Sequence, residues 1–190
     1  MQVVAWMTGT LFSFSLMAVG ARELSEHIAI HQTLFFRSAI GLVCVSAVLL
    51  ASKQKVSIQT KRLNLHTLRN IFHFAGQYGW FLGIGLLPLA EVFALEFTVP
   101  IWTLAVASFV LNEKITKQKV VSILLGIMGV FIILKPGLTI INSASLIVLA
   151  SAVCYAISHI ATKSLSSSES PLSILFYMCP VSYTHLRAHE

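Results

Sequence analysis

The sequence predicts an all-α fold, a polytopic bundle of transmembrane helices, and three observations carry this prediction. Of the 190 residues, 56% are hydrophobic and only 11% are charged, whereas soluble domains have about 25% charged residues. The mean hydropathy is +0.84. Long apolar stretches alternate with short polar connections, and about 20 apolar residues are enough for a helix to cross a bilayer. We therefore expect the lipid bilayer to be the main partner of this chain.

Six apolar segments are long enough to span a membrane. They cover residues 2–20, 32–52, 68–87, 90–111, 118–135 and 144–163. A seventh starts at Ser170 and reaches Pro180 before polar sequence begins. The third and fourth segments meet at Pro88, which predicts a tight helical hairpin because proline is tolerated at the start of a helix. The N-terminus has no basic region of the secretory type, so the first segment is predicted to be retained as a helix.

The basic residues indicate an orientation. There are 13 Lys and Arg residues and seven Glu residues, giving a formal net charge of +6. Eight of the basic residues lie in connections 53–69 and 112–119, against two in 21–31 and 135–143. This pattern favours a topogenic role over nucleic-acid binding. We expect a multi-pass protein of the inner (plasma) membrane with its N-terminus and both basic connections in the cytoplasm.

The sequence offers no pattern for a metal, a nucleotide or a catalytic residue. Cys44, Cys154 and Cys179 are far apart, each within an apolar segment, which indicates free thiols. Zinc, phosphate-loop and nucleophile-elbow motifs are all missing from the sequence. We expect neither a metal nor another cofactor, and no enzymatic activity.

Two carboxylates stand in the fourth apolar segment. A carboxylate at the centre of a membrane helix costs about 2.5–3.5 kcal/mol on insertion scales, so such residues usually face a cavity or a partner. Glu91 is near the start of the segment, where a favourable helix N-terminus explains it as well as a pathway does. Glu96 lies about 7.5 Å deeper by the helical rise, and a place in a substrate or proton pathway is the favoured interpretation.

Arg37 and Pro100 complete this region. Arg37, in the second segment, falls between the two carboxylates in depth and is expected to pair with one of them or to extend toward the membrane surface. Pro100 is a candidate for a helix kink, because it removes a backbone hydrogen bond and permits a moving gate.

The third segment places polar side chains on one side. Arg69, His73, Gln77 and Trp80 follow at spacings of four, four and three residues. Arg69 is predicted to anchor the helix at the interface. His73 and Gln77 are deeper, and His73 serves either a hydrogen bond between helices or a proton relay. On the same helix Ala75, Gly79 and Gly83 predict a small-residue ridge for close packing.

Tyr155 lies in the sixth segment, on one face with Ser151 and Ser158. Either it lines a substrate path or it donates a hydrogen bond to a neighbouring helix.

Several motifs in this order resemble the EamA-type repeat of the drug/metabolite transporter superfamily. They are FFRSAIGL, LPLAE, FTVPIWT, NEKIT and GIMGVFIILKPG. The resemblance covers roughly residues 5–136. The family's turn commonly reads G-E-[KR], and here Asn112 stands in place of the glycine while Glu113 and Lys114 match. Glu113 is expected to cap or pair locally.

The resemblance implies ten helices in two inverted five-helix repeats, with substrate near the midplane and alternating access. Residues 2–136 would form the first repeat and 144–180 the start of the second. The implied function is a secondary transporter, an exporter or permease, of small organic metabolites or amphipathic compounds of unknown identity. The alternative is a non-transporting membrane protein or truncated fragment that acts only as an assembly partner.

The polar residues 181–190 resemble read-through from a joined gene end, with a divergent natural tail as the alternative. We expect a chain truncated after about seven helices. If it is naturally this short, a homodimer is expected to rebuild the two-half pathway.

Overall fold

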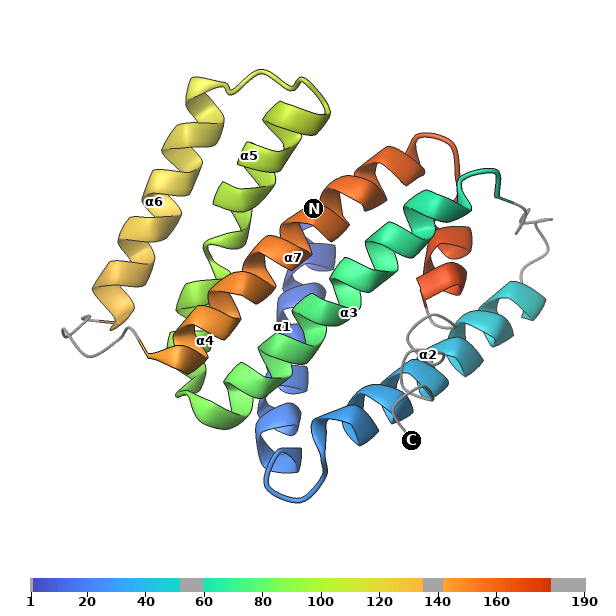
Figure 1. Ribbon diagram of the computed structural model, residues 1–190, viewed down its shortest axis with the longest axis horizontal. Helices are drawn as coiled ribbons and strands as arrows, with labels where there is room; N and C mark the ends of the chain where they lie inside the picture. The colour runs from blue at the N-terminus through green and yellow to red at the C-terminus, as the bar shows by residue number, and fades with distance from the viewer. Residues whose placement is uncertain (1, 52–59, 135–141, 179–190) are drawn as a thin grey trace.

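The computed structural model describes residues 2–51, 60–134 and 142–178, and every regular element among them is a helix (Figure 1). The labelled helices are α1 (Gln2–Leu24), α2 (Ile30–Ala51), α3 (Leu63–Leu86), α4 (Leu89–Glu96), α5 (Val99–Val110), α6 (Lys117–Leu134) and α7 (Ser143–Ser166). Residues 171–178 are also helical. The prediction of an all-α polytopic bundle is confirmed, while Cys179 and the tail 181–190 lie outside the described residues.

Four helical segments within the described ranges are long and apolar enough to cross a membrane. They are α1, α2, the segment Leu89–Val110 that contains α4 and α5, and α7. The sequence predicts six such segments; α3 and α6 are helical too but are not among the four. In α3 the physical reason is the polar first half, which includes Arg69, Asn70 and His73.

Helices α3 and α7 pack side by side through the middle of the molecule (Figure 1). Glycines on α3 allow this close approach: a Cβ on Gly76 would come within 3.1 Å of the carbonyl oxygen of Ser151. A Cβ on Gly79 or Gly83 would overlap side chains of α7. The ridge predicted from Ala75, Gly79 and Gly83 is therefore corrected at one position, because Ala75 is exposed and Gly76 takes its place.

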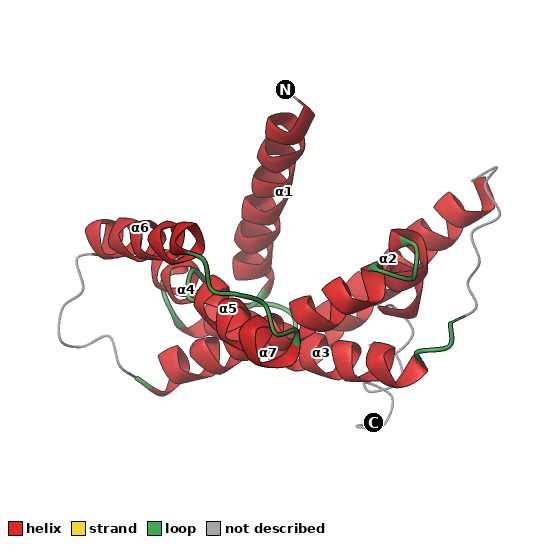
Figure 2. Cartoon of the chain, turned by 90° about the horizontal axis from the view of Figure 1, so that it is seen from above, coloured by secondary structure: helices red, strands yellow, loops and turns green. Residues whose placement is uncertain are grey.

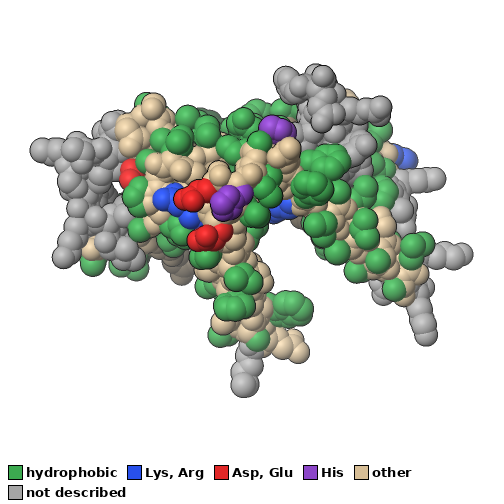
Figure 3. All heavy atoms as spheres, turned by 90° about the horizontal axis from the view of Figure 1, so that it is seen from below, with side chains coloured by type: hydrophobic (Ala, Val, Ile, Leu, Met, Phe, Trp, Pro, Cys, Tyr) green, Lys and Arg blue, Asp and Glu red, His purple; other side chains and the backbone are tan. Residues whose placement is uncertain are grey.

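The C-terminal end of α1 is attached to this pair, while its N-terminal part stands away from the other helices (Figure 2). Ala18 and Ala21 are buried, and the guanidinium of Arg22 donates to the backbone carbonyls of Ile84 and Leu87. Toward the N-terminus Trp6 is 78% exposed. Figure 3 shows this helix projecting with a hydrophobic surface, and charged and histidine side chains gathered near its base.

The fourth predicted segment is one span interrupted in its middle. Helix α4 ends at Glu96 and α5 begins at Val99, with Pro100 in its first turn. Proline has no N–H for the carbonyl of the residue four positions earlier, which here is Glu96, and its ring crowds that carbonyl. The next N–H in the chain, that of Ile101, donates to the carbonyl of Thr98, three residues earlier, at 2.9 Å. The break therefore leaves Glu96 as the last residue of a helix within the membrane span.

The turn between α5 and α6 contains Asn112, the residue that stands where the family pattern has glycine. Its φ is +50°, in the left-handed region that glycine adopts most readily and that asparagine tolerates better than other residues. The departure from the glycine pattern thus preserves the backbone conformation of the turn.

Candidate functional site

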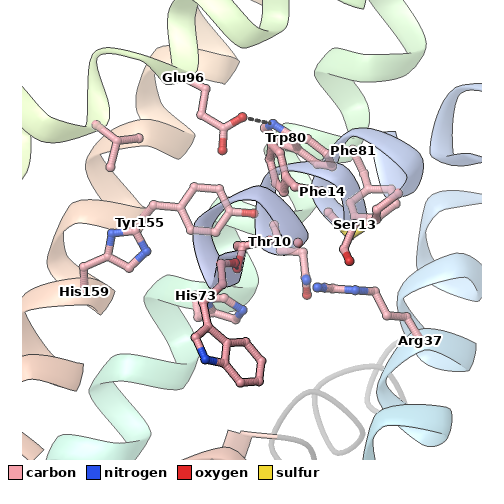
Figure 4. A pocket seen from close by; sticks show the side chains of 15 residues that line it. Thr10, Ser13, Phe14, Arg37, His73, Trp80, Phe81, Glu96, Tyr155 and His159 are labelled. Carbon is pink, nitrogen blue, oxygen red and sulfur yellow. Dashed lines mark hydrogen bonds between the residues drawn. The ribbon is translucent and has the colours of Figure 1, made fainter. Parts of the chain in front are cut away.

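A cavity of about 780 Å³ lies among α1, α2, α3, α4, α5 and α7, and we call it the central cavity (Figure 4). Helix α3 contributes His73, Gln77 and Trp80, the three deep residues that the sequence places on one side of this helix. The spacing of four and three residues keeps them on one face, and the glycines of α3 turn a different face toward α7. One helix thereby both packs tightly and presents polar groups to the cavity.

Glu96 is held at the end of α4 by a hydrogen bond across the cavity wall. Its Oε2 accepts from the indole Nε1–H of Trp80 at 2.8 Å (Figure 4). Trp80 is 2% exposed and packs against Phe14 of α1 with ring centroids 5.4 Å apart. Glu96 is half-buried, and the fixed donor gives its carboxylate a defined position. Figure 4 shows its other oxygen directed into the cavity.

Tyr155 and His159 of α7 form the part of the cavity wall next to His73. The ring of Tyr155 meets His73 edge-on at 5.7 Å and stacks on His159 at 6.2 Å with planes 20° apart. Figure 4 shows Tyr155 beside both histidines, with its hydroxyl directed into the cavity. Of the two interpretations left open for Tyr155, this placement supports a lining role.

Arg37 reaches the same cavity from α2, where Figure 4 shows its guanidinium directed inward. Arg37 and Glu96 therefore bring opposite charges to one cavity that also has several aromatic rings. Such a lining can stack a flat ring and orient a ligand that bears both a positive and a negative group. Direct pairing of Arg37 with either carboxylate stays a prediction.

Glu91 lies away from this cavity lining, at the start of α4. Its Oε1 accepts a hydrogen bond of 3.1 Å from Ser145 Oγ. Ser145 is in the first turn of α7, whose N-cap Asn142 accepts from the Ser145 N–H at 2.9 Å. The carboxylate thus sits near the positive end of α7, which is a favourable place for a negative charge.

A second cavity, of about 1090 Å³, lies between α1, α5 and α6 and also borders α7. We call it the lateral cavity. It shares four lining residues with the central cavity, namely Phe14, Glu96, Val99 and His159. Pro100 lines the lateral cavity, so the predicted kink position borders one cavity and Glu96 borders both.

Glu113 joins helices that are distant in sequence. Its carboxylate pairs with Lys119 at 3.0 Å and with Lys163 of α7. The hydrogen bonds from Lys163 and then Lys119 lower the pKa of Glu113 below its ordinary value. Local pairing is confirmed by Lys119, but the sequence analysis missed the pair with Lys163, because a contact across 50 residues leaves no spacing signal.

Buried polar residues at the N-terminal end of α3 form another cluster that the sequence analysis missed. His66 is 2% exposed, and its Nε2 lies 2.7 Å from Oε2 of Glu169. Burial opposes ionisation of Glu169, but hydrogen bonds from Thr60 and His66 outweigh it and lower the pKa of this carboxyl. The sequence signal for this cluster was the close spacing of polar residues within positions 66–70.

Arg69 belongs to this cluster, and the prediction that it anchors α3 at the interface is wrong. It is 5% exposed, and its Nε donates to Thr162 Oγ1 of α7 at 2.6 Å. Asn70 beside it donates to the carbonyl of Tyr177 at 2.7 Å. The cluster holds α3, α7 and the helix 171–178 together.

Within the described ranges, no group of three His, Cys or Glu side chains could hold a metal ion. Cys44 and Cys154 are both free thiols. The residues that line the two cavities offer charge, hydrogen-bonding groups and aromatic rings.

Comparison with known proteins gives a family. The model of the EamA-like transporter family matches residues 1–135. The S-adenosylmethionine uptake transporter of Rickettsia prowazekii is 29% identical over 175 residues, which are 92% of this chain and 59% of that protein. The riboflavin transporter of Vibrio cholerae is 26% identical over 181 residues, or 94% of this chain and 61% of that protein.

The pseudopaline exporter CntI of Pseudomonas aeruginosa is 26% identical over 171 residues, or 90% of this chain and 60% of that protein. The chain thus spans about three fifths of the length of these relatives. No solved structure is significantly similar to it. These relatives are named as transporters and not as enzymes. The family match over more than half of the chain, together with its apolar helices, makes this a multi-pass membrane protein that belongs to the EamA-like transporter family.

Proposed function

We propose that this chain forms part of a secondary transporter that moves a small organic metabolite through the central cavity by alternating access, as an exporter or permease. The observation that carries the proposal is the presence of Glu96 and Arg37 in one aromatic-lined cavity. Ionisable residues inside membrane helices usually face a cavity and mark substrate or ion pathways. The inverted repeats of such transporters place the substrate near the bilayer midplane.

The cavity lining favours a metabolite that combines a flat ring with charged groups. Trp6, Phe14 and Tyr155 offer aromatic surface, Glu96 offers a site for a cation and Arg37 one for a carboxylate. S-adenosylmethionine, the substrate in the name of one relative, has an adenine ring, a sulfonium and a zwitterionic amino-acid group. It is therefore the first compound to test, followed by riboflavin, named for another relative.

The test is flux of radiolabelled S-adenosylmethionine or riboflavin into proteoliposomes that contain the full chain. We expect uptake above that of empty vesicles. Glu96→Gln should lower it roughly tenfold, the effect of losing about 1.4 kcal/mol of interaction, and should change its dependence on pH. Glu91→Gln is the matched control, because Glu91 bonds to Ser145 outside the cavity lining.

Two outcomes count against this proposal. Absence of flux for both compounds, with no binding in a direct binding assay, would refute transport of this substrate class by the chain. Flux through Glu96→Gln that equals wild-type flux at every pH would remove Glu96 from the mechanism.

The orientation belongs to the same proposal. The basic residues of the connections favour an inner-membrane protein whose N-terminus and 112–116 turn are cytoplasmic. Reporter fusions test it: green fluorescent protein joined after Lys114 should fluoresce, and alkaline phosphatase joined after Glu26 should be active. The reverse pattern would invert the topology.

A second candidate, an assembly partner without transport of its own, is favoured by one observation. Most of α1 is exposed, with Trp6 at 78% and Phe12 at 71%, whereas membrane helices commonly pack one face on a neighbour. In this case a second copy would pack against α1 in a homodimer. Cross-linking of Phe12→Cys in membranes tests this: a chain that stays monomeric argues against the dimer.

A further inference from the structure

We propose that the lateral cavity is an aqueous access path that connects Glu96 with the surface at the 112–116 turn, and that the ion pairs of Glu113 close its mouth. The use of this path to couple an ion to metabolite transport rests on the proposed transport function, but the existence of the path does not depend on that function. The occupants we assign to it are water and small hydrated cations.

The lining of the lateral cavity offers several polar groups to water. About half of its lining residues have polar side chains, among them Thr103, Ser122, Gln118 and His159, although most of the surface that the lining turns to the cavity is apolar. A cavity with several polar partners can hold ordered water, whereas a purely apolar one stays dry. These polar residues come from three different helices, α5, α6 and α7.

The broken helix provides a second and independent observation. Pro100 has no N–H to donate to the carbonyl of Glu96, and Phe97, Val99 and Pro100 all line the lateral cavity. Backbone that is freed from helical hydrogen bonds at membrane depth is tolerated where protein or water satisfies it. Water in the lateral cavity would supply the donor that proline lacks.

The path has two distinct ends. At the inner end, Glu96 and His159 line both cavities. At the outer end, Glu113, Lys119 and Lys163 line the lateral cavity and face solvent. The twelve residues of α5 lie between these ends, a length of about 18 Å at the helical rise.

The mouth is closed by charge pairs that cross it. Glu113 lies in the turn, whereas Lys163 is on α7, so their pair joins the two sides of the opening. Lys119 of α6 holds the same carboxylate at 3.0 Å. We call the ion pairs of Glu113 with Lys119 and Lys163 the clasp. Exposed ion pairs contribute little to stability, so these pairs can separate at a low cost in free energy.

Several charged or titratable side chains line the two cavities together with Glu96. They are Arg37, His73, Tyr155 and His159 in the central cavity, and Glu113, Lys119, Lys163 and again His159 in the lateral cavity. An aqueous path would let Glu96 exchange with solvent on the side of the turn while the central cavity holds the metabolite.

Thiol accessibility tests the path without knowledge of the substrate. In the full chain with Cys44, Cys154 and Cys179 replaced by serine, Thr103→Cys places a thiol in the lateral cavity. Trp102→Cys is the matched control, because Trp102 is next to Thr103 and so lies at nearly the same depth. Its side chain is 38% exposed and belongs to neither cavity lining. The probes are membrane-impermeant methanethiosulfonates added on the side of the turn, one cationic and one anionic, so that an effect of local charge is separated from an effect of access.

We expect Thr103→Cys to react roughly tenfold or more faster than Trp102→Cys, because the hydrated thiolate is the reactive form. Leu104→Cys, also in the lining and partly exposed, is the second test position if Thr103→Cys is poorly inserted. Equal rates at lining and control positions would overturn the access path.

The clasp is tested in the same background. Glu113→Gln should raise the reaction rate of Thr103→Cys roughly threefold or more with the cationic and the anionic probe alike, since it removes the charge that holds both lysines. A change of opposite sign for the two probes would be an effect of local charge and would overturn the clasp. Lys117→Gln, a nearby substitution outside the cavity lining, should leave the reaction rate of Thr103→Cys unchanged. A rate unaffected by Glu113→Gln would overturn the clasp. Fast labelling of Thr103→Cys without any metabolite flux would refute the proposed function and keep the access path. Metabolite flux without labelling would keep the proposed function and refute the access path.

Discussion

Glu96 Oε2 lies 2.8 Å from Nε1 of Trp80, and this hydrogen bond ties the end of a broken membrane helix to α3, which packs closely against α7. Trp80 belongs to the buried core, while Glu96 borders two cavities. The pair therefore connects the rigid part of the protein with its candidate pathway.

Replacing Trp80 with phenylalanine should remove the donor and keep most of the aromatic packing against Phe14. A hydrogen bond to a charged group at a buried position contributes about 1.5–3 kcal/mol, so we expect a loss of that order in the free energy of unfolding. Unfolding in mixed micelles by increasing denaturing detergent measures it. Trp6→Phe is the control, because Trp6 is 78% exposed; equal losses for the two variants would contradict a special role for the Trp80 indole.

A large residue at Gly79 should disrupt the α3–α7 contact. Even a Cβ there would overlap Ser151 and come 3.2 Å from Ile147 Cγ2, and overpacking of this kind costs about 1–3 kcal/mol. We expect Gly79→Leu to lower the melting temperature in detergent. Gly20→Leu is the matched control, since a Cβ on Gly20 meets no atom within 4 Å. A Gly79→Leu protein as stable as Gly20→Leu would show that the helices do not need this close approach.

Pro100→Ala should join α4 and α5 into one helix, because alanine restores an N–H for the carbonyl of Glu96. Spin labels at Ala90 and Ser108 would then approach the spacing of a straight helix, about 27 Å for 18 residues, with a narrower distance distribution. Double electron–electron resonance measures this distance. Pro88→Ala, in the hairpin before α4, should leave the distribution unchanged, and an unchanged distribution in Pro100→Ala would assign the break to another cause.

The Glu169 carboxylate should make stability depend on pH. Burial raises its pKa, but the hydrogen bonds from Thr60 and His66 outweigh this and leave the pKa lowered. A group with a lowered folded pKa stabilises the protein above its unfolded pKa, and this contribution is lost as pH falls through the folded value. Wild type should therefore melt at a higher temperature than Glu169→Gln at neutral pH.

The two proteins should converge as pH falls to about 3, below the ordinary range of a glutamate. Melting curves across this range, recorded in detergent, provide the measurement. Glu23→Gln is the control, since Glu23 is outside the cluster around His66. A difference between wild type and Glu169→Gln that stays constant with pH would show that the contribution of Glu169 is not electrostatic.

Much of the helical arrangement follows from local sequence. Apolar length predicts each of the long helices, and Pro88 predicts the hairpin that the structure has between α3 and α4. The one-sided spacing of His73, Gln77 and Trp80 predicts that these residues share the same surroundings, and all three line the central cavity. Such features depend on neighbours within one or two helical turns, which is the range over which a sequence pattern acts.

Contacts between distant segments could not be predicted in the same way. Arg69 reads as an interfacial residue by position, yet α7 and the helix 171–178 cover it. The sequence predicts that Glu113 caps or pairs locally, yet its carboxylate also pairs with Lys163, which is 50 residues away in the chain. In both cases the partner is set by how α7 crosses the other helices, and no spacing within either segment contains that information.

By itself, the sequence determined an all-α membrane protein with charged residues in its fourth span, because hydrophobic length and the cost of buried charge are properties of single segments. Only the tertiary structure decided that Glu96 borders two cavities while Glu91 bonds to Ser145. The physical reason is the close packing of α3 on α7, which glycines permit, combined with the break before Pro100. Together they set the rotation and depth of each helix, and thus which polar side chains meet.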